Sequence, residues 1–181
     1  SIDRYLRIFD FPKPIIAQIH GYCLGIATQM AVMCDLTIVA DDAKIGFPSI
    51  PVGGGYISPM WSWLIGPKRA KELSFTVGSK ISGTTAAEWG YANRSVPADK
   101  LEDTVKEMAQ EIAKVPSKIL KIKKLANNRT MDAQGFRHAI RAGAEFDAML
   151  HFSNPVTKMT SFMREKGMQQ AFDAFNSGDF S

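Results

Sequence analysis

Residues 13–35, KPIIAQIHGYCLGIATQMAVMCD, determine which type of fold this chain of 181 residues can adopt. Ile15–Ile19 is a β-branched run between a proline and a glycine, which is typical of a buried strand. His20–Gly25 contains two glycines and predicts a turn. The apolar segment Ile26–Cys34 predicts a helix directly after it. The stretch therefore predicts a strand, a glycine-bearing turn and a helix.

The flanking sequence extends this pattern in both directions. Apolar residues at Ile2, Leu6 and Phe9 have the spacing of an amphipathic helix. Asp35 ends the first unit, and another β-branched run follows it. The elements predicted here are a helix over Ser1–Phe9, a strand over Leu36–Ala40, a short strand over Lys44–Gly46 and a proline- and glycine-rich loop over Phe47–Gly55.

Helical signals dominate from Tyr56 onward. Gly66-Pro67 predicts the end of one helix and the start of the next. We also expect capping boxes at Thr85–Glu88, in a helix that ends at Gly90, and at Asp99–Glu102, and an N-cap at Asn154 followed by Pro155. The composition changes near Val96-Pro97. We therefore expect an α/β section over residues 1–96 and an all-helical section over residues 97–181 that extends the same fold.

The composition is that of one folded globular domain. Hydrophobic residues make up 45% of the chain and charged residues 22%, which excludes disordered, collagen-like and coiled-coil classes. The net charge of +4 is spread along the chain and carries no nucleic-acid signature. Neither a Gly-x-Gly-x-x-Gly nor a Gly-x-x-x-x-Gly-Lys-Ser/Thr motif is present, which disfavours dinucleotide and P-loop nucleotide binding.

Ile15–Cys34 is long enough to span a bilayer and has no formally charged residue. Polar residues and glycines interrupt it, so a strand and a helix explain it better than a membrane span. We expect no membrane segment and a cytoplasmic location. Cys23 and Cys34 flank the predicted helix, whose rise separates them by on the order of 12 Å. A disulfide needs Cα atoms within about 7 Å, so both thiols are expected to be free.

The start of the predicted helix at Ile26 is the most informative feature for function. The first N–H groups of a helix have no intrahelical partner, and the helix dipole places positive charge there. Such a position stabilises a phosphate or an oxyanion that develops on a carbonyl. Gly25 would let a substrate approach the backbone closely. The alternative is a strand–turn–helix connection without any ligand.

An ordered series of motifs makes a family resemblance specific. The run from Lys13 to Asp35 resembles the signature block of the enoyl-CoA hydratase/isomerase (crotonase) superfamily, and the similarity continues along essentially the whole chain. The further matching segments are Asp42–Pro48, Gly66–Leu73, Ala87–Asn93, Lys123 and Asn127.

The resemblance implies an α/β fold with a crotonase-like spiral core of ββα turns and an all-helical C-terminal trimerisation region. It implies a homotrimer, or a hexamer built as a dimer of trimers. It also implies that two backbone N–H groups hold the thioester carbonyl of an acyl-CoA and stabilise an enolate or oxyanion. By position, the N–H of Ile26 is one donor, and Leu24 and Gly25 are expected to bind substrate. Coenzyme A is then part of the substrate, and no separate cofactor is expected.

The sequence departs from the family at the acid–base positions. Hydratases of the family carry two glutamates, and the matching positions here are Gln29 and Ser49. A glutamine amide does not take up a proton at neutral pH, and an unassisted serine is a very weak base. A standard hydratase reaction is therefore disfavoured.

Two further departures concern the acyl pocket and the family's N-terminal segment. The segment over residues 53–59 differs from the family's longer entry to the next helix, so we expect a reshaped pocket. The segment that supplies the second oxyanion donor in the family has no match here. We expect little activity from this chain alone, because losing one donor costs about 3 kcal/mol of transition-state stabilisation. The residues expected to line the pocket are Pro48, Gly53, Gly54, Tyr56 and Trp61; Trp61 and Trp63 have core positions on a helix as their alternative.

The other titratable residues have simpler explanations. His20, His138 and His151 show no zinc-type spacing, so no metal site is expected. Asp35, Asp41 and Asp42 fit helix-end and turn positions. A basic helix face meets either CoA phosphates or RNA, or is simply solvated, and we favour the solvated face. This face is formed by Lys114, Lys118, Lys121, Lys123, Lys124 and Arg129.

Two functions are consistent with these observations. The first is an acyl-CoA isomerase, lyase or hydrolase that uses oxyanion stabilisation without the paired glutamates. The second is a non-catalytic acyl-CoA-binding or assembly module. Product formation from any acyl-CoA supports the first, and binding without turnover supports the second.

Overall fold

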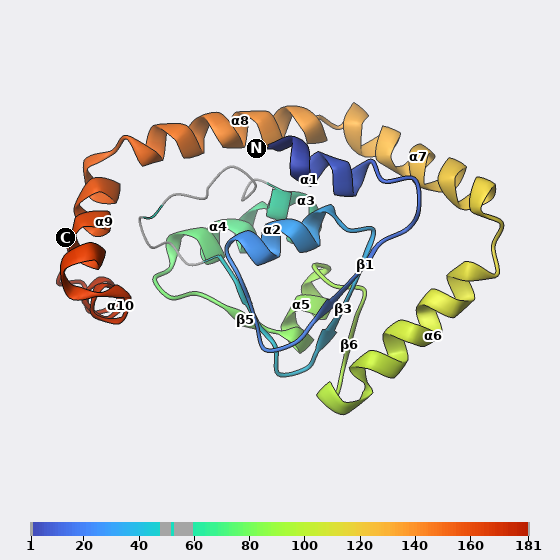
Figure 1. Ribbon diagram of the computed structural model, residues 1–181, viewed down its shortest axis with the longest axis horizontal. Coiled ribbons are helices and arrows are strands. Elements are labelled where there is room, and N and C mark those ends of the chain that lie inside the picture. The colour runs from blue at the N-terminus through green and yellow to red at the C-terminus, as the bar shows by residue number, and fades with distance from the viewer. Residues whose placement is uncertain (1, 48–51, 53–59, 181) are drawn as a thin grey trace.

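The structure is a computed structural model that describes residues 2–47, 52 and 60–180. Its first part alternates short strands with short helices, and its second part contains helices alone (Figure 1). The first part comprises α1 (Ile2–Phe9), β1 (Ile16–Ile19), β2 (Tyr22–Leu24), α2 (Ile26–Met33), β3 (Leu36–Ala40), β4 (Lys44–Gly46), α3 (Trp61–Ile65), α4 (Pro67–Phe75), β5 (Ile81–Ser82), α5 (Gly83–Trp89) and β6 (Arg94–Val96). The second part comprises the 3-10 turn η2 (Ala98–Lys100) and the helices α6 (Leu101–Ala113), α7 (Ser117–Ala133), α8 (Phe136–His151), α9 (Asn154–Lys166) and α10 (Met168–Ser177).

The strands form two small sheets, and the first four strands along the chain belong alternately to one sheet and the other. One sheet has the order β1-β3-β6 and is entirely parallel, with Ile16 opposite Leu36. The other has the order β2-β4-β5, with Tyr22 opposite Lys44 in the parallel β2–β4 pair and an antiparallel β4–β5 pair. The segments β1–β2–α2 and β3–β4 each add one strand to each sheet. This is the start of a spiral of ββα turns.

The main core lies between the strands and α3 to α5. Ile38, Val39 and Ile45 are fully buried because their strands are covered on both sides. At Gly83 a Cβ atom would lie 1.9 Å from the carbonyl oxygen of Ala40. Helix α5 therefore packs directly against the backbone at the end of β3, and only glycine allows this approach.

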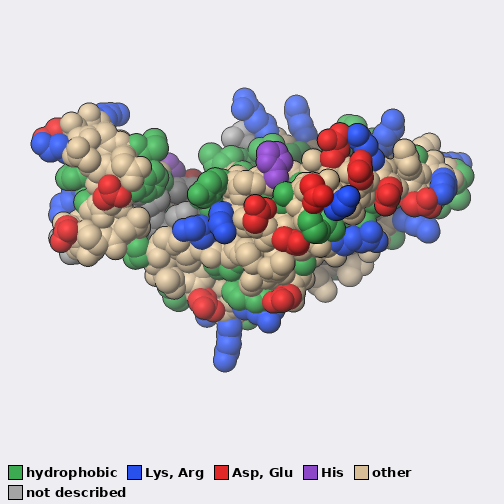
Figure 2. All heavy atoms as spheres, turned by 90° about the horizontal axis from the view of Figure 1, so that it is seen from below, with side chains coloured by type: hydrophobic (Ala, Val, Ile, Leu, Met, Phe, Trp, Pro, Cys, Tyr) green, Lys and Arg blue, Asp and Glu red, His purple; other side chains and the backbone are tan. Residues whose placement is uncertain are grey.

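The second-part helices form an arc around the strands. Helix α6 lies against β1 and β3, α7 and α8 run end to end along the upper edge of Figure 1, and α9 and α10 lie at its left. Polar contacts hold α7 to the first part: Lys124 Nζ donates to Asp35 Oδ2 at 2.7 Å, and Asn128 Nδ2 donates to the Phe9 carbonyl at 2.9 Å. Viewed from below, a notch separates the lobe at the left from the rest of the molecule (Figure 2).

The predicted elements need several corrections. The segment predicted as a turn over His20–Gly25 contains the strand β2, which exists because it pairs with β4. The first strand begins at Ile16 rather than Ile15, and α2 ends at Met33 rather than Cys34. The break at Gly66-Pro67 is confirmed, since Gly66 separates α3 from α4.

The helix caps also differ from the prediction. Ser82, not Thr85, caps α5, and its Oγ accepts from the Thr85 N–H at 3.1 Å. The predicted end of that helix at Gly90 is confirmed, and Gly90 adopts the left-handed conformation. The predicted box at Asp99–Glu102 is wrong, because residues 98–100 form a 3-10 turn with no side-chain cap on α6. The N-cap of α9 is Ser153, one residue before Asn154. In α6 the 3-10 turn before the helix shifts its start.

One cluster of charges predicts a pH dependence of stability. Arg137 Nη1 donates to Asp10 Oδ2 at 2.9 Å, and its Nε donates to Asp132 Oδ1 at 2.9 Å. The hydrogen bond from Arg137 lowers the pKa of Asp10 in the folded chain. A lowered carboxyl pKa adds stability above the unfolded-state pKa of about 3.9, and this stability is lost as the pH falls through the folded pKa.

We expect Asp10→Asn to reduce the free energy of unfolding by less than about 1 kcal/mol at pH 7, because the Asp10 side chain is 50% exposed. The difference from the unmodified chain should shrink below pH 4. Urea unfolding of both proteins between pH 3 and pH 7 measures it. A difference that grows toward low pH would contradict the assignment. Asp99→Asn, on an exposed residue, is the control.

Candidate functional site at the N-terminus of helix α2

Gly25 creates the opening at the start of α2. Its φ of 53° is accessible to glycine and rarely to other residues. In this conformation its N–H donates to the Gly46 carbonyl at 3.1 Å, and its carbonyl accepts from the N–H groups of Thr28 at 3.0 Å and Gln29 at 3.3 Å. Ile26 is the first residue of the helix and is exposed at the surface. Because Ile26 begins the helix, α2 contains no carbonyl four residues earlier that could accept from its N–H. This N–H is therefore available to a ligand at the end of the helix.

Buried side chains pack against the N-terminal end of α2 on the side that faces the core. Thr28 and Gln29 are completely buried. Tyr91 donates from its hydroxyl to the Thr28 carbonyl at 3.2 Å, and the ring of Trp61 stacks on Tyr91 with centroids 4.4 Å apart. Aromatic stacking of this kind fixes the tyrosine ring, so the hydroxyl is aimed at the first turn of α2. The backbone geometry of the site is thus supported by the core.

The titratable groups beneath α2 are neutral at physiological pH. Burial raises the pKa of Cys23 to about 11, against a smaller lowering by its hydrogen bond with Tyr91. Burial also raises the pKa of Tyr91 well above its ordinary value. The first turn of α2 has no acidic residue. This end of the helix can therefore stabilise negative charge, and neither the Cys23 thiol nor the Tyr91 hydroxyl beneath it serves as a base.

An apolar groove of about 460 Å³ begins beside this helix end. It runs between β1, β2 and α2, and Ala27, the residue after Ile26, lies in its wall. Ile19, Tyr22 and Met30 are other wall residues. The groove has the size and lining of a site for the apolar part of a small ligand.

A second cavity of about 510 Å³ lies at the opposite end of α2. Its wall includes Cys34, Asp35 and Lys124, together with Lys123 and Asn127 from α7. The Lys124 side chain is only 7% exposed and forms an ion pair with Asp35. This cavity is separate from the helix N-terminus, and the ion pair in its wall ties α7 to the end of α2.

The structure brings together only part of the residue set expected from the sequence. Four of the expected residues lie close together where β2 leads into α2: Leu24 ends β2, Gly25 is the N-cap, and Ile26 and Gln29 belong to α2. The sequence allows two roles for Trp61, and the structure shows the core role, since the side chain is 2% exposed. Pro48, Ser49, Gly53, Gly54 and Tyr56 lie outside the described residues, as does most of the loop predicted over Phe47–Gly55.

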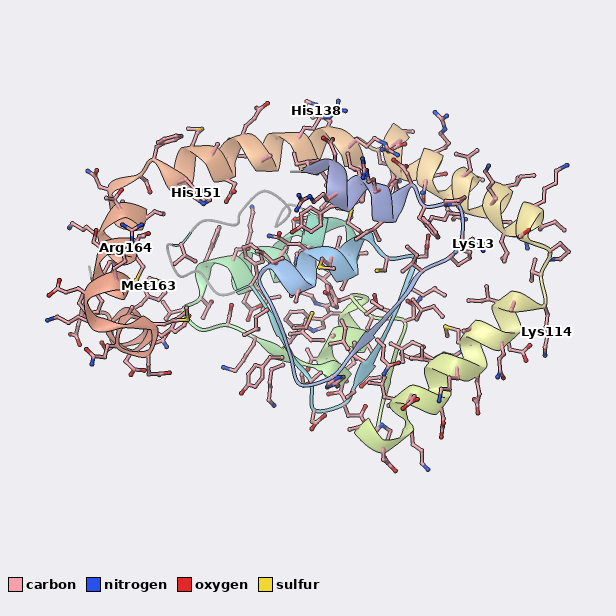
Figure 3. The ribbon with its side chains drawn as sticks, in the orientation of Figure 1. Lys13, Lys114, His138, His151, Met163 and Arg164 are labelled. Atoms are coloured by element: carbon pink, nitrogen blue, oxygen red, sulfur yellow. The ribbon has the colours of Figure 1, made fainter. Side chains whose placement is uncertain are left out.

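The remaining candidates do not form a site. The three histidines lie on different parts of the chain, with His138 and His151 near opposite ends of α8 (Figure 3). Among residues 2–47, 52 and 60–180, no cluster of three or more histidine, cysteine or acidic side chains could hold a metal ion. Both cysteines are free, as predicted. In the same residues, no helix is both long and apolar enough to cross a membrane.

Sequence reasoning missed the roles of Tyr91 and Lys124. Tyr91 follows the helix-ending Gly90, and its contact with Thr28 joins residues 63 positions apart. Lys124 belongs to a run of basic residues that predicts a solvated face, yet it is buried and paired. The only local signal was that Lys124 shares a helix face with Leu120 and Met131, at the spacing of residues that face a core.

Comparison with known proteins places this geometry in a family. The family model described as enoyl-CoA hydratase/isomerase matches residues 1–172. The chain belongs to the enoyl-CoA hydratase/isomerase family, whose other name is the crotonase superfamily. The two-sheet spiral and the helical second part are the fold of this family.

Particular relatives agree with this assignment. A structure from Novosphingobium aromaticivorans, assigned to the enoyl-CoA hydratase/isomerase class, is 40% identical with a TM-score of 0.91, over 96% of this chain and 64% of its own. An enoyl-CoA hydratase/isomerase from Xanthobacter autotrophicus Py2 is 31% identical with a TM-score of 0.89, over 99% of this chain and 67% of its own. The carnitinyl-CoA dehydratase of Citrobacter koseri is 28% identical over 88% of this chain. The chain spans 64% of the length of that curated relative.

Proposed function

We propose that this chain is part of an acyl-CoA-processing enzyme in which the N–H of Ile26 binds the thioester carbonyl oxygen. When the α-carbon loses a proton or a carboxyl group, negative charge moves to that oxygen. A backbone donor at a helix N-terminus stabilises this charge, and one such donor contributes roughly 3 kcal/mol to the transition state. The observation that carries the proposal is that Ile26, the first residue of α2, is exposed. The preceding residue, Gly25, has a φ of 53°, a conformation that favours glycine.

We infer further that the reaction is not a standard hydration. Adding water across a double bond needs positioned acid–base groups. Gln29 and Ser49 occupy the positions of the family's glutamates, Gln29 is buried, and the first turn of α2 has no acid. An isomerisation needs one base, which must come from other residues. A decarboxylation needs no base, because loss of CO2 leaves the electron pair of the broken C–C bond on the enolate, which the oxyanion site stabilises until water protonates the α-carbon. The names of the relatives include hydratase and dehydratase, so hydration is the competing reaction in the test.

Leu24 and Gly25 are proposed to contact the thioester, and the apolar groove beside Ala27 to receive an apolar part of the ligand. Coenzyme A enters as part of the substrate. Self-association as a trimer or a dimer of trimers, and a cytoplasmic location, are parts of the same proposal. A non-catalytic acyl-CoA-binding module is the second candidate, favoured by the neutral Cys23 and Tyr91 and by the amide at Gln29.

A panel of acyl-CoA thioesters tests the proposal. A longer form of the protein that adds an N-terminal segment to residues 1–181 is assayed with crotonyl-CoA, acetoacetyl-CoA and malonyl-CoA, because residues 1–181 alone are expected to have little activity. Binding of each thioester is measured in parallel by calorimetry. We expect all three to bind, slow crotonyl-CoA hydration, and product formation from acetoacetyl-CoA or malonyl-CoA. Ser49→Ala should leave this turnover within about threefold, and so should Gln29→Met, which fills the volume of the completely buried Gln29 without its amide. Fast hydration of crotonyl-CoA that either variant abolishes would refute the non-hydratase assignment, and binding without any product would establish the second candidate.

A further inference from the structure

The cavity at the C-terminal end of α2 takes no part in the proposed reaction. Its volume of about 510 Å³ is in the range of small-molecule sites. It lies between α6 and α7, which pass outside the strands in Figure 1, and the parts of α1, α2, α3 and β3 that face them. Much of its wall is apolar and half-buried, and the residues of this kind are Val32, Leu36, Leu64, Ile112, Leu120 and Met131. The cavity leaves part of each of these side chains without a packing partner, which favours an apolar occupant.

Helix α7 contributes one whole face to the wall of this cavity. The residues of that face recur at the spacing of one side of a helix and are Leu120, Lys123, Lys124, Asn127, Asn128 and Met131. The two ends of the face are apolar, and the four residues in the middle are polar. The cavity therefore has a polar side on α7 and an apolar side opposite it, which is the arrangement of a site for an amphipathic molecule.

Two of the four polar residues are already bound to the protein itself. Lys124 Nζ donates to Asp35 Oδ2 at 2.7 Å. It also donates to the carbonyls of Lys13 at 3.3 Å and Ile8 at 3.5 Å, so all three of its N–H groups are used. Asn128 Nδ2 donates to a carbonyl of α1 at 2.9 Å. A ligand in the cavity must therefore be recognised by the other two polar residues.

Lys123 leaves one positive charge at the cavity without a counter-charge. Within residues 2–47, 52 and 60–180, its ammonium has no ion-pair or hydrogen-bond partner. The other titratable groups of the wall are Cys34, Asp35 and Lys124. Burial raises the pKa of the Cys34 thiol, so this group is neutral. The formal charge of the wall is then 2 − 1 = +1, which a monoanion balances.

Asn127 supplies a second donor beside the Lys123 ammonium. It lies one helical turn after Lys123 on the same face. One N–H of its amide donates to the Lys123 carbonyl at 2.9 Å, and in the described part of the chain the other N–H has no acceptor. A carboxylate accepts from two neighbouring donors with its two oxygens, and such charge-assisted hydrogen bonds are stronger than those of a neutral head group. The charge and the two donors therefore favour a carboxylate.

We propose that this cavity binds a small apolar carboxylic acid in its ionised form. The carboxylate lies at Lys123 and Asn127, and the apolar chain of the ligand lies against the half-buried apolar wall. Burial of that chain supplies affinity, and the Lys123 charge selects the head group. The inference goes beyond the proposed function, because the cavity is at the opposite end of α2 from Ile26 and its ligand is a free acid rather than a thioester.

Titration calorimetry with octanoate tests the site. Octanoate, kept below its micelle concentration, should bind to residues 1–181 with one molecule per chain. Lys123→Met removes the free charge and should weaken octanoate binding by about tenfold, the usual effect of losing a hydrogen bond to a charged group. Octanol has the same chain without the charge, and its weaker binding should not change in this variant. Lys121→Met makes the same substitution at an exposed position of α7 outside the cavity wall and should bind octanoate like the unmodified chain.

A third variant distinguishes this cavity from the apolar groove beside Ile26. Ala27→Phe narrows the groove at an exposed residue of α2 and should leave octanoate binding unchanged. Circular dichroism verifies that all three variants are folded. Absence of octanoate binding, or equal binding by Lys123→Met and Lys121→Met, overturns the proposed site. Loss of binding in Ala27→Phe alone would place octanoate in the groove and also overturns it. The titration uses no thioester, so its failure leaves the proposed reaction untouched, and loss of thioester turnover would count only against the proposed function.

Discussion

Replacing Ile26 by proline is expected to lower kcat on any thioester that the protein turns over by about 10²- to 10³-fold, the usual effect of removing one oxyanion donor. Proline has no N–H, so the variant removes the proposed donor itself. Ile26 is the first residue of α2, where proline is well tolerated because that N–H has no helical partner. Gly25, the preceding residue, has no Cβ to clash with the proline ring. Fold and acyl-CoA binding should therefore be retained.

Ile26→Ala is the matched control. It removes the exposed side chain but keeps the N–H, so its kcat should stay within a few-fold of the unmodified value. A second readout is independent of turnover: bound acetoacetyl-CoA should show more of its enolate absorbance with Ile26→Ala than with Ile26→Pro. Equal activity and equal enolate absorbance in the two variants would show that the Ile26 N–H is not the donor. Far-ultraviolet circular dichroism and the urea midpoint verify that Ile26→Pro is folded.

The second large effect is expected at Lys124. Its Nζ donates to Asp35 Oδ2 at 2.7 Å and to the Lys13 carbonyl at 3.3 Å, and its side chain is 7% exposed. Asp35 Oδ2 also accepts from the Ile15 N–H at 2.7 Å. Lys124→Met fills a similar volume but leaves the Asp35 carboxylate, 22% exposed, without its cation. Breaking a buried pair in this way costs about 3 kcal/mol, measured as the free energy of unfolding in urea.

The neighbouring residue supplies the control for Lys124. Lys123→Met makes the same chemical change at an exposed position of the same helix and should alter the free energy of unfolding by less than about 0.5 kcal/mol. Adding Asp35→Asn to Lys124→Met removes the uncompensated charge and should restore part of the stability. The role assigned to the ion pair is wrong if Lys124→Met and Lys123→Met unfold at the same urea concentration.

Local sequence patterns predicted the strands and helices that form because of the residues within the segment itself. The β-branched run before His20 and the apolar segment after Gly25 are a strand and a helix in the structure, with ends that differ by one residue. Strand β2 was missed because Tyr22–Leu24 lies between two glycines and is extended only through its pairing with β4. The start of α5 was misplaced because Ser82, at the end of β5, is the residue whose hydroxyl meets the Thr85 N–H. Such features depend on partners that a short window of sequence does not contain.

The sequence by itself determined that a helix begins at Ile26, because an apolar helical segment follows a glycine-bearing turn there. The first N–H groups of any helix have no partner within that helix. It also determined the amide at Gln29, and so the lack of a carboxylate there. Only the tertiary structure decided that Tyr91 and Trp61 support this helix end, that Lys124 is buried and that Ile119, Ile122 and Leu125 are exposed. The physical reason is that burial depends on which surfaces meet after the chain has folded. In α7 part of this arrangement is the reverse of the usual one, since Lys124 and Asn128 face the protein while Ile119, Ile122 and Leu125 are exposed.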